Sequence, residues 1–599
     1  MMKKSVIGLG AFFVLLTALA YVPSFTAPFQ FDDGFLFHKN TVTRNFIWEQ
    51  IWQYDPSRFL TNMTFVFNYV WGAQDVFSYH AVNFVIHLGV GALAAVFLHQ
   101  LLRFPWGGNP PAGAWVKEGL VFSVLIFLLH PIQTSAVIYV IQRSTLLASF
   151  FYLAALVFYC RFILENNKKS YVFVLLCTAL GALCKPIIFT LPLTIIFLEI
   201  LVIRKGAIDK VRVFRRVVLV ALTVLLVPVL LSLWKYKSAS LSSVLSMSQE
   251  TDVISRAEYL RTQFSVLMTY LKLLFLPLNQ QLDYDFPISK SFFELRTMAS
   301  LAGLIFIAWL AVKARRKVPA FTFFIFWFLC TLSLESSIFP IADVIFEHRL
   351  YLPMLGFAFF VPAAVSLVIK NRKIFIIVLS GILLVYGTLT FQRGLLWQDP
   401  EKFLLDGVFK APKKARVYHN LGNFYLNAGK TDAALENFYK ALELDPYYIP
   451  SINNIGNIKM RDKQYDEALK YYNLAIQLSP DYEVPYFNRA SIYLFFNNTQ
   501  AALDDYAKVL EINPYVIPVY INRGNILSQN KNYKGALLNY NQALVLDPQN
   551  GMAYYNRSLC YFHLNDFDRA YADILKAEEY QYPVEKAFVE NLMKRIQTR

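Results

Sequence analysis

The chain carries little charge for its length. Only 16% of its 599 residues are charged, whereas a soluble protein would carry roughly 25%. Acidic residues are especially scarce up to about residue 395, where the sequence is strongly apolar, while residues 396–599 have the composition of a soluble domain. A single soluble fold is therefore excluded. The sequence predicts a membrane domain over 1–395 followed by a globular domain over 396–599.

Cysteine is also rare. Of the five cysteines, only Cys560 lies in the globular part, so no disulfide framework is expected. The net charge of +16 does not indicate nucleic-acid binding. Much of the excess lies in short basic clusters between apolar runs, where membrane topology accounts for it. The expected partner is therefore a lipid bilayer, and no nucleic acid is expected.

The chain starts with an apolar run from Ser5 to Val22. A cleaved signal peptide is the alternative interpretation of this run, but the run is long enough to span a bilayer. We expect it to form an uncleaved first transmembrane helix.

Apolar runs of roughly 18 residues or more predict about eleven transmembrane helices. They lie near residues 5–22, 79–102, 118–136, 138–160, 170–184, 186–203, 217–234, 295–312, 319–336, 350–369 and 373–391. With this number of spans all the basic clusters fall on one side, which the positive-inside rule makes the cytoplasm. The loop around Asp32, the 235–294 segment, the 337–349 loop and the globular domain then face the other side. An amphipathic stretch at 259–278 is expected to lie along the membrane interface, and if it crosses instead, the globular domain moves to the other side.

The globular domain contains an internal repeat. Prolines recur every 34 residues, at positions 412, 446, 480, 514 and 548. The first unit reads Tyr418…Leu421-Gly422…Tyr425…Ala434…Phe438…Ala441…Pro446. Period and pattern are those of the tetratricopeptide unit, a helix pair that buries its apolar face by stacking on its neighbours. The sequence predicts an α-solenoid of five repeats over about 415–582, followed by a capping helix.

Each repeat carries an asparagine at one position of its first helix where packing does not demand it. These residues are Asn420, Asn454, Asn488, Asn522 and Asn556. First helices of stacked repeats line a concave groove, and an amide offers a donor and an acceptor to a peptide backbone of any sequence. The ladder resembles that of the repeat superhelix of O-GlcNAc transferase. We expect it to bind a polypeptide, the alternative being that it only ties neighbouring repeats together.

Arginines follow the asparagine in the last three repeats and would favour acidic partners. They are Arg489, Arg523 and Arg557.

Two adjacent carboxylates, Asp32 and Asp33, follow the first apolar span by about ten residues. A carboxylate beside low-dielectric surroundings can have a raised pKa and act as a base on a hydroxyl. An ordinary solvated loop is the alternative for such a pair. Two acids can also hold Mg²⁺ or Mn²⁺, but no further acids lie close enough in sequence to complete a site. We therefore expect no metal site, with a divalent cation as the alternative.

Polar and basic residues gather at the outer ends of the predicted spans. His80 and His87 share one helical face, Arg143 lies near the outer end of the fourth span, and Lys185 and Arg349 lie in short segments beside later spans. Ionisable residues within membranes are costly and tend to mark function. Cations there would stabilise the developing charge of a lipid-phosphate leaving group. Snorkelling or helix capping is the alternative for each residue alone.

In their order and spacing these motifs resemble the transmembrane and tetratricopeptide repeat-containing O-mannosyltransferases, which belong to the GT-C class of glycosyltransferases. The resemblance covers nearly the whole chain. It rests on Phe31-Asp-Asp33 with Asn40, Arg58-Phe-Leu-Thr61, Tyr79-His-x-x-Asn83 with His87, His130-Pro-Ile-Gln-Thr-Ser-Ala136, Gln142-Arg-Ser-Thr-Leu-Leu147, Leu183-Cys-Lys185, Glu347-His-Arg-Leu-Tyr-Leu-Pro353 with Gly356, and Trp397-Gln-Asp399. Two positions depart from the family pattern: Gln142 stands where Gly is usual, and Pro186 where an acid is common.

The resemblance implies an all-α fold, a GT-C membrane domain followed by the repeats. It also implies transfer of mannose or another hexose, with inversion, from a polyprenyl-phosphate sugar to Ser or Thr hydroxyls of exported proteins held in the repeat groove. Asp32 matches the base that deprotonates the acceptor, and Asp33 matches the neighbour that positions acceptor or donor. The residues expected at the donor phosphate are Arg143, Lys185, Arg349, His80 and His87.

Two other functions remain open from the sequence. A GT-C oligosaccharide ligase would use a polyprenyl-diphosphate glycan and need more basic groups, and a membrane-anchored repeat scaffold would not need Asp32. A transporter is disfavoured, because no paired spans broken by Gly or Pro recur in corresponding halves. The chain ends Ile-Gln-Thr-Arg599 without an ER-retrieval tail. This favours a bacterial inner membrane, with the active site and the repeats facing the periplasm.

Overall fold

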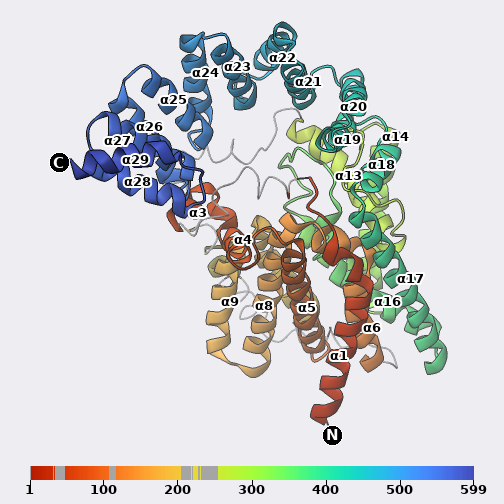
Figure 1. The fold of residues 1–599 in the computed structure, drawn as a ribbon. Coiled ribbons are helices and arrows are strands. Elements are labelled where there is room, and N and C mark those ends of the chain that lie inside the picture. Colours follow the sequence, from red (N-terminus) through yellow and green to blue (C-terminus); the bar gives the residue numbers. More distant parts are fainter. Residues whose placement is uncertain are drawn as a thin grey trace. The chain divides into compact units, whose positions relative to one another are not determined.

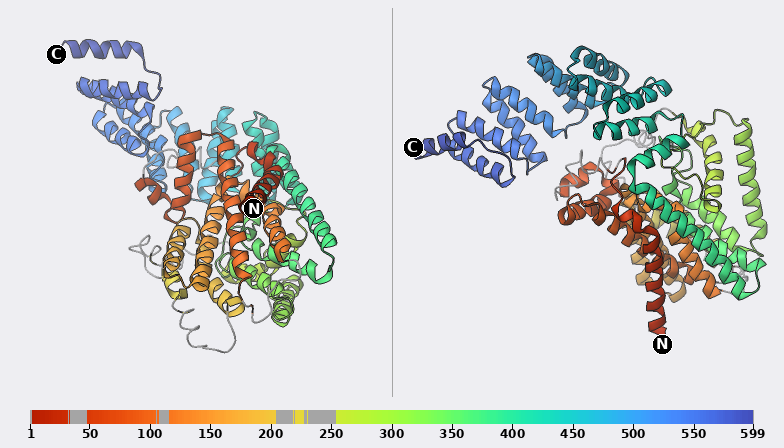
Figure 2. Two further views of the ribbon diagram at one scale, coloured as in Figure 1. Left: turned by 90° about the horizontal axis from the view of Figure 1, so that it is seen from below. Right: turned by 45° about the vertical axis from the view of Figure 1, so that its right-hand side comes forward.

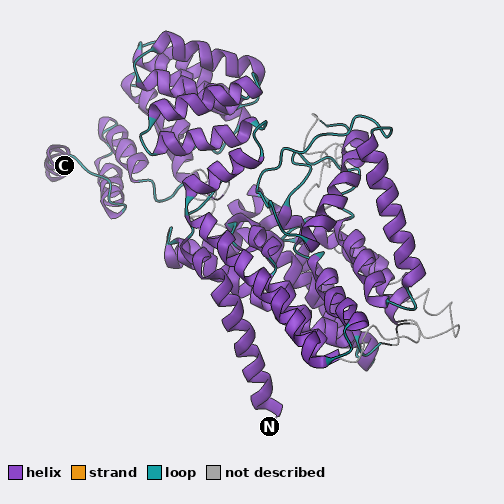
Figure 3. Ribbon diagram, turned by 90° about the vertical axis from the view of Figure 1, so that its right-hand side faces the viewer, coloured by secondary structure: helices purple, strands orange, loops and turns teal. Residues whose placement is uncertain are grey.

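The computed structural model describes residues 2–31, 33, 48–104, 106, 116–203, 218, 220–226, 230 and 254–598. All regular structure in these ranges is helical (Figure 3). The chain divides into two compact units, Met1–Pro412 and Lys413–Arg599. The first unit includes α18 (Pro400–Lys410), whose Lys410 Nζ donates to the carbonyl of Gln280 at 2.8 Å.

The first unit is built from helices (Figure 1), and short 3₁₀ turns lie between several of them. Its helices before the 204–253 stretch are α1 (Met2–Tyr21), α3 (Trp48–Tyr54), α4 (Phe59–Gly72), α5 (Val76–Leu101), α6 (Val116–Leu129), α7 (Thr134–Val137), α8 (Arg143–Glu165), α9 (Lys168–Ala182) and α10 (Leu191–Leu198). Its later helices are α13 (Arg256–Phe275), α14 (Leu295–Ala314), α15 (Pro319–Leu332), α16 (Met354–Val368), α17 (Arg372–Gln398) and α18. Helices α5, α8 and α9 pack side by side.

Five helical stretches of the described residues are long and apolar enough to cross a membrane, fewer than the eleven expected. They are Val76–Leu101, Val140–Glu165, Pro186–Ile203, Leu295–Ala314 and Arg372–Gln398. Val116–Leu129 and Pro131–Val137 make a sixth if this pair, bent by 42°, is one span. The bend falls at Pro131, whose ring cannot supply the N–H that would continue the helix. The chain is an integral membrane protein.

The other expected spans have different outcomes. Apolar helices at Gly10–Thr26, Pro319–Leu332 and Met354–Val368 coincide with three of them but are shorter than 18 residues. Helix α9, at the fifth expected span, has 15 residues. The expected span at 217–234 lies mostly outside the described residues.

The amphipathic stretch expected at 259–278 is helix α13. It starts with a capping box, in which Ser255 and Glu258 each bond the other's backbone N–H. Its buried face holds two tyrosines that reach the segment before α16. The hydroxyl of Tyr259 donates to the carbonyl of Glu335 at 2.6 Å, and that of Tyr270 to the carbonyl of Phe346 at 2.9 Å. Helix α13 therefore fixes the backbone at both ends of residues 335–346.

The second unit consists of helix pairs that follow one another in chain order, teal to blue in Figure 1 and Figure 2. The first helices of the pairs are α19 (Ala415–Asn427), α21 (Ile449–Arg461), α23 (Glu483–Phe495), α25 (Ile517–Gln529) and α27 (Gly551–His563). Their partners are α20 (Thr431–Leu444), α22 (Tyr465–Leu478), α24 (Thr499–Ile512), α26 (Tyr533–Leu546) and α28 (Phe567–Glu579), and α29 (Lys586–Gln597) follows.

The two helices of a pair approach closely where the repeat has a small residue. A Cβ added at Gly524 would lie 2.5 Å from the Tyr540 ring, and one at Gly422 would lie 2.6 Å from the Phe438 ring. Such distances are far inside van der Waals contact, so these positions require glycine. The repeat pattern read from the sequence is thus a packing pattern.

Candidate functional site

Of the expected acid pair, Asp32 lies outside the described residues, while Asp33 is buried and 1% exposed. The Asp33 carboxylate accepts the backbone N–H of Ile141 at 2.8 Å and that of Val140 at 3.3 Å, and Gln30 N lies 3.4 Å from it. The N–H groups of Val140 and Ile141 belong to the 3₁₀ turn Val140–Gln142, immediately before α8. Asp33 therefore anchors the segment after α1 to the start of α8.

The two histidines of α5 make contacts of the same kind. His80 Nε2 lies 2.8 Å from the carbonyl of Ala27, and His87 bridges the Tyr351 hydroxyl at 2.7 Å and the Leu128 carbonyl at 3.2 Å. Both side chains are buried. His80 thus holds the chain shortly before Asp33, and His87 links α5 to α6 and to Tyr351. Each was expected at the donor phosphate, and in this structure each ring bonds within the protein.

Arg143 is fully buried and donates to residues of α4 and α5. Its Nε bonds Asn83 Oδ1 at 2.7 Å, and its two terminal nitrogens bond Asn68 Oδ1 at 2.6 Å and the Tyr79 carbonyl at 3.1 Å. The guanidinium also lies over the Phe65 ring, 4.4 Å from its centroid. Each guanidinium nitrogen thus has a protein acceptor. Arg143 ties α4, α5 and α8 together directly after the turn that Asp33 caps.

Lys185 and Arg349, the other two expected phosphate ligands, lie in one electrostatic cluster around Glu335. Lys185 Nζ lies 2.8 Å from Glu335 Oε1 and donates to Thr145 Oγ1 at 3.2 Å. Arg349 donates to the carbonyls of Asp343 and Val344 at 2.8 and 3.2 Å. Its charge acts on both Lys185 and Glu335. The structure therefore brings two of the five expected phosphate residues together.

Arg58, in the 3₁₀ turn Pro56–Arg58, also acts on this cluster. Burial alone would raise the pKa of the Glu335 carboxyl, but Lys185, Arg349 and Arg58 outweigh burial and hold that pKa below its ordinary value. Burial lowers the pKa of Lys185, and Glu335 opposes this shift. Burial next to these cations also holds the pKa of His348 well below its ordinary value, so its ring is neutral.

We call Lys185, Arg349, Arg58 and Glu335 the cation cluster. It contains three positive groups and one carboxylate. Arg58, whose side chain is 47% exposed, also lies 3.7 Å from the carboxylate of Asp55, so the net excess is one positive charge. Glu335 Oε2 and His348 Nδ1 are buried and have no hydrogen-bond partner among the described residues. The two largely buried cations, Lys185 and Arg349, share the single carboxylate of Glu335. Such an excess of positive charge is suited to binding an anion.

Sequence reasoning did not single out Glu335 or assign a role to Arg58. A signal was present for Glu335, which is the only acidic residue between Glu294 and Asp343. Its partner Lys185 lies 150 positions earlier, so the pairing itself depends on the fold.

Glu347 fixes the turn that carries His348 and Arg349. Its buried carboxylate accepts from the backbone N–H of Gln281 at 2.6 Å and the Tyr284 hydroxyl at 2.7 Å, and it pairs with Arg393 of α17 at 3.2 Å. This network joins the chain after α13 to α17, and it fixes the backbone of the turn that carries Arg349.

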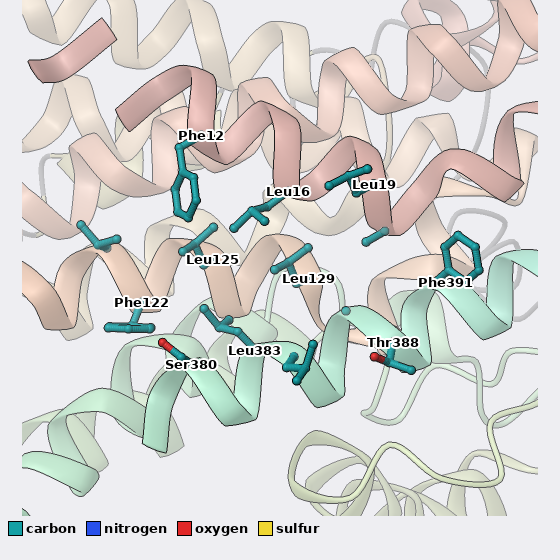
Figure 4. Close-up of a pocket in the computed structure, with 14 residues that line it drawn as sticks. Phe12, Leu16, Leu19, Phe122, Leu125, Leu129, Ser380, Leu383, Thr388 and Phe391 are labelled. Carbon is teal, nitrogen blue, oxygen red and sulfur yellow. The ribbon is translucent and has the colours of Figure 1, made fainter. Parts of the chain in front are cut away.

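No group of three or more His, Cys, Asp or Glu side chains is placed to hold a metal ion in the ranges that the structure describes. An apolar cavity of about 500 Å³ lies between α1, α6 and α17 and is lined by residues such as Phe12, Leu125 and Leu383 (Figure 4). Its walls offer hydrocarbon contact and lack charged groups, so it is suited to lipid chains and not to chemistry.

The asparagine ladder of the second unit bonds between repeats. The side-chain N–H groups of Asn454, Asn488 and Asn556 donate to an asparagine of the preceding repeat, at 2.6, 2.9 and 2.9 Å. Asn522 donates instead to the Tyr506 hydroxyl at 3.0 Å, because Ser491 occupies the place of that earlier asparagine. Asn420 belongs to the first repeat and has no repeat before it.

The ladder amides thus use their donors to tie repeats together, as the alternative interpretation held. The side-chain oxygens of Asn488, Asn522 and Asn556 accept no hydrogen bond from the residues that the structure describes, and these side chains are half-buried. Along this face the ladder offers acceptors, which suit the N–H groups of a peptide backbone.

Known proteins resemble both parts of the chain. Models of the tetratricopeptide repeat match residues 415–448, 448–514, 517–550 and 553–582. The protein O-mannosyl-transferase F38B6.6 of Caenorhabditis elegans is 25% identical over 65% of this chain and 54% of its own length. TMTC3 of Mus musculus, also named a protein O-mannosyl-transferase, is 23% identical over 72% of this chain and 50% of its own.

Among solved structures, the crystal structure of MamA is 20% identical and covers 27% of this chain and 94% of that one, with a TM-score of 0.25. The chain spans about half the length of the curated relatives it matches. It is therefore related over most of its length to proteins named protein O-mannosyl-transferases, and its second unit is a tetratricopeptide-repeat domain.

Proposed function

We propose that this protein is a membrane glycosyltransferase that moves mannose or another hexose from a polyprenyl-phosphate carrier to a Ser or Thr hydroxyl of a polypeptide. The single observation that carries the proposal is the cation cluster, in which the largely buried Lys185 and Arg349 share one carboxylate, Glu335. The named activity of the relatives agrees with it.

In the proposed reaction the acceptor hydroxyl oxygen attacks the anomeric carbon, and the bond from that carbon to the phosphate oxygen breaks. Asp32 takes the hydroxyl proton, and polyprenyl phosphate leaves with the bonding electron pair. The donor phosphodiester carries one negative charge and the leaving phosphate carries about two, so negative charge grows as the bond breaks. Cations beside the phosphate attract the doubly charged leaving group more strongly than the singly charged donor, so the cluster would stabilise the transition state preferentially.

Asp33, His80 and Arg143 have positioning roles in this proposal. Asp33 and His80 fasten the chain on either side of Phe31, and Arg143 braces the start of α8 that Asp33 caps. The contacts of Asp33 and of the chain before Phe31 would then position Asp32, the proposed base.

The charge of the cluster also bears on the alternative donor. A glycan on a polyprenyl diphosphate would leave with about three negative charges, more than the excess that the cluster supplies. A leaving monophosphate carries about two negative charges, which is closer to that excess, so the cluster favours a monophosphate donor. A non-enzymatic scaffold has no use for a buried excess of cations, which is destabilising without an anion.

The repeat unit would hold the acceptor polypeptide through the ladder oxygens, with the enzyme in a bacterial inner membrane and the repeats on the periplasmic side. Backbone recognition of this kind is independent of side-chain sequence, which suits an enzyme with many acceptors.

The test is mass spectrometry of envelope proteins from cells that carry the wild-type chain or the Asp32→Asn variant. The swap keeps the side-chain shape and removes the base. We expect hexose-bearing Ser or Thr peptides in the wild type and their loss in the variant at equal expression. Survival of the modification would rule out Asp32 as the base, and its absence from wild-type cells would favour the scaffold.

A further inference from the structure

Three arginines, Arg489, Arg523 and Arg557, occupy the same position in the last three repeats of the second unit, 34 residues apart. Each follows a ladder asparagine on the first helix of its pair. The surroundings of the outer two are nearly identical, and those of Arg523 differ.

Arg489 is fully paired. It forms a bidentate ion pair with Asp505 of α24, in which Nε donates to Oδ2 at 2.9 Å and Nη2 donates to Oδ1 at 2.7 Å. Its Nη1 donates to Asn473 Oδ1 of α22 at 2.6 Å. The guanidinium also lies near the rings of Tyr486 and Tyr493, at 5.6 and 5.7 Å from their centroids. A carboxylate from its own repeat and an amide from the preceding one thus enclose it.

Arg557 repeats this arrangement. It pairs with Asp573 at 2.7 and 2.6 Å and donates from Nη1 to Asn541 at 2.7 Å. Tyr554 and Tyr561 flank it at 5.3 and 5.8 Å. Two repeats therefore build the same closed arginine site.

Arg523 occupies the corresponding position on α25, but it lacks the partners that Arg489 and Arg557 have. The residues 34 positions after the partners of Arg489 would surround Arg523. Asn539 replaces the carboxylate of Asp505, and Ala507 replaces the amide of Asn473. Leu527 replaces Tyr493, and Tyr520 corresponds to Tyr486. Asn539 donates its side-chain N–H to the carbonyl of Gly535 at 2.9 Å. Across the described ranges the Arg523 side chain has no hydrogen bond and no ion pair, although it is half-buried.

The open side of Arg523 faces solvent. In the flanking repeats Asn473 and Asn541 cover Nη1 from the exposed surface, and at the corresponding place Ala507 is exposed and has no polar group. A half-buried guanidinium without a counter-charge, next to a residue too small to cover it, is ready to accept a carboxylate from outside.

We propose that Arg523 binds an Asp or Glu side chain of the acceptor polypeptide, above Ala507, so that the repeat unit selects acceptors with an acidic residue at one fixed place. This inference rests on the proposed function, because it assumes that the repeats hold the acceptor. The ladder would then bind the peptide backbone, and Arg523 would add the preference for an acidic side chain. Arg489 and Arg557 contribute none, because Asp505 and Asp573 already neutralise them.

The structure offers two variants that remove this site in opposite ways. Arg523→Gln removes the cation. Asn539→Asp keeps the arginine but supplies the internal carboxylate that the flanking repeats have, so it closes the site and should also stabilise the repeats.

The matched control is Asn437→Asp, at the same position of the first repeat. Asn437 makes the same bond as Asn539, to the carbonyl of Ala433 at 2.8 Å, and the residue in the place of the arginine there is Leu421. Asn437→Asp therefore adds the same charge as Asn539→Asp, but no arginine occupies the corresponding place.

The experiment measures binding of fluorescent 15-residue Ser/Thr-containing peptides to the purified full chain in nanodiscs, by polarisation. Each peptide is made in two forms that differ only by Asp or Asn at one place. We expect wild type and Asn437→Asp to bind the Asp form of some peptides roughly fivefold more tightly, and this preference to fall with added salt. Arg523→Gln and Asn539→Asp should bind both forms alike.

Equal binding of Asp and Asn forms by the wild-type chain would overturn the role of Arg523 while leaving acceptor binding intact. A preference that persists in Asn539→Asp or in Arg523→Gln would overturn it too. Failure of the wild-type chain to bind any peptide would overturn both this inference and the proposed binding of the acceptor.

Discussion

Replacing Glu335 by glutamine tests the cation cluster most informatively, because Glu335 is the carboxylate that the buried Lys185 and Arg349 share. Lys185 Nζ and Glu335 Oε1 are 2.8 Å apart, and their side chains are only 12% and 11% exposed. Removing one partner of a buried ion pair typically destabilises a protein by about 3–5 kcal/mol, because the other charge stays buried and unpaired. The free protein should lose roughly that much stability.

The same substitution should strengthen binding of the leaving group. In the wild type a phosphate must compete with Glu335 for Lys185, and in Glu335→Gln it meets Lys185 and Arg349 without that competitor. The assay is thermal unfolding of the purified chain in detergent, with and without polyprenyl phosphate. We expect a lower melting temperature for the free variant and a larger stabilisation by polyprenyl phosphate than in the wild type.

Glu118→Gln is the matched control, since Glu118 pairs with Arg372 at 2.5 Å but the arginine side chain is 59% exposed. It should change stability by about 1 kcal/mol or less and leave the effect of polyprenyl phosphate unchanged. If Glu335→Gln melts like the wild type, or gains no extra stabilisation from polyprenyl phosphate, the reasoning about the cluster is refuted.

Three further predictions concern positioning and stability. Asp33→Ala leaves two buried backbone N–H groups without their acceptor, about 1–3 kcal/mol each, and should speed amide hydrogen exchange at residues 140–141 with loss of transfer activity. Arg143→Lys cannot reach the acceptors on α4 and α5 together and should lower the melting temperature of the whole chain, whereas Arg372→Lys should not. Burial lowers the pKa of His419 to about 4, below its unfolded value near 6.5. Its contribution to the stability of the repeat unit is therefore complete above pH 6.5 and is lost as the pH falls toward 4, by up to about 3 kcal/mol. Urea unfolding of residues 413–599 at pH 7.5 and 4.5 should show this loss for the wild type and little of it for His419→Gln.

The repeat unit was predictable from sequence because its packing is local. The small residues at Gly422 and Gly524 must recur where aromatic rings of the paired helix press against them, so the 34-residue period appears in the sequence itself. The apolar runs likewise located helices to within a few residues. Their membrane-crossing lengths were harder to predict. Pro131 marks a break in the third expected span because its ring supplies no N–H to continue the helix, but the sequence does not give the 42° bend found there.

The candidate site was less predictable because its residues come from distant segments. Lys185 and Arg349 were expected near a phosphate, and they share a cluster, but their common partner Glu335 can be assigned only from the fold. Arg143 and His87 satisfied the same sequence criterion of polar residues within spans, yet their side chains form hydrogen bonds to groups inside the protein. Sequence alone does not distinguish a buried tether from a ligand.

Equilibrium binding of radiolabelled polyprenyl phosphate to the purified chain in nanodiscs tests the central claim most directly. Wild type and Arg372→Gln should bind alike, and Lys185→Gln should bind at least about tenfold more weakly, since a charge-assisted hydrogen bond to a buried phosphate contributes about 1.5–3 kcal/mol. Equal affinity of Lys185→Gln and wild type would contradict the assignment of the cation cluster to the donor phosphate.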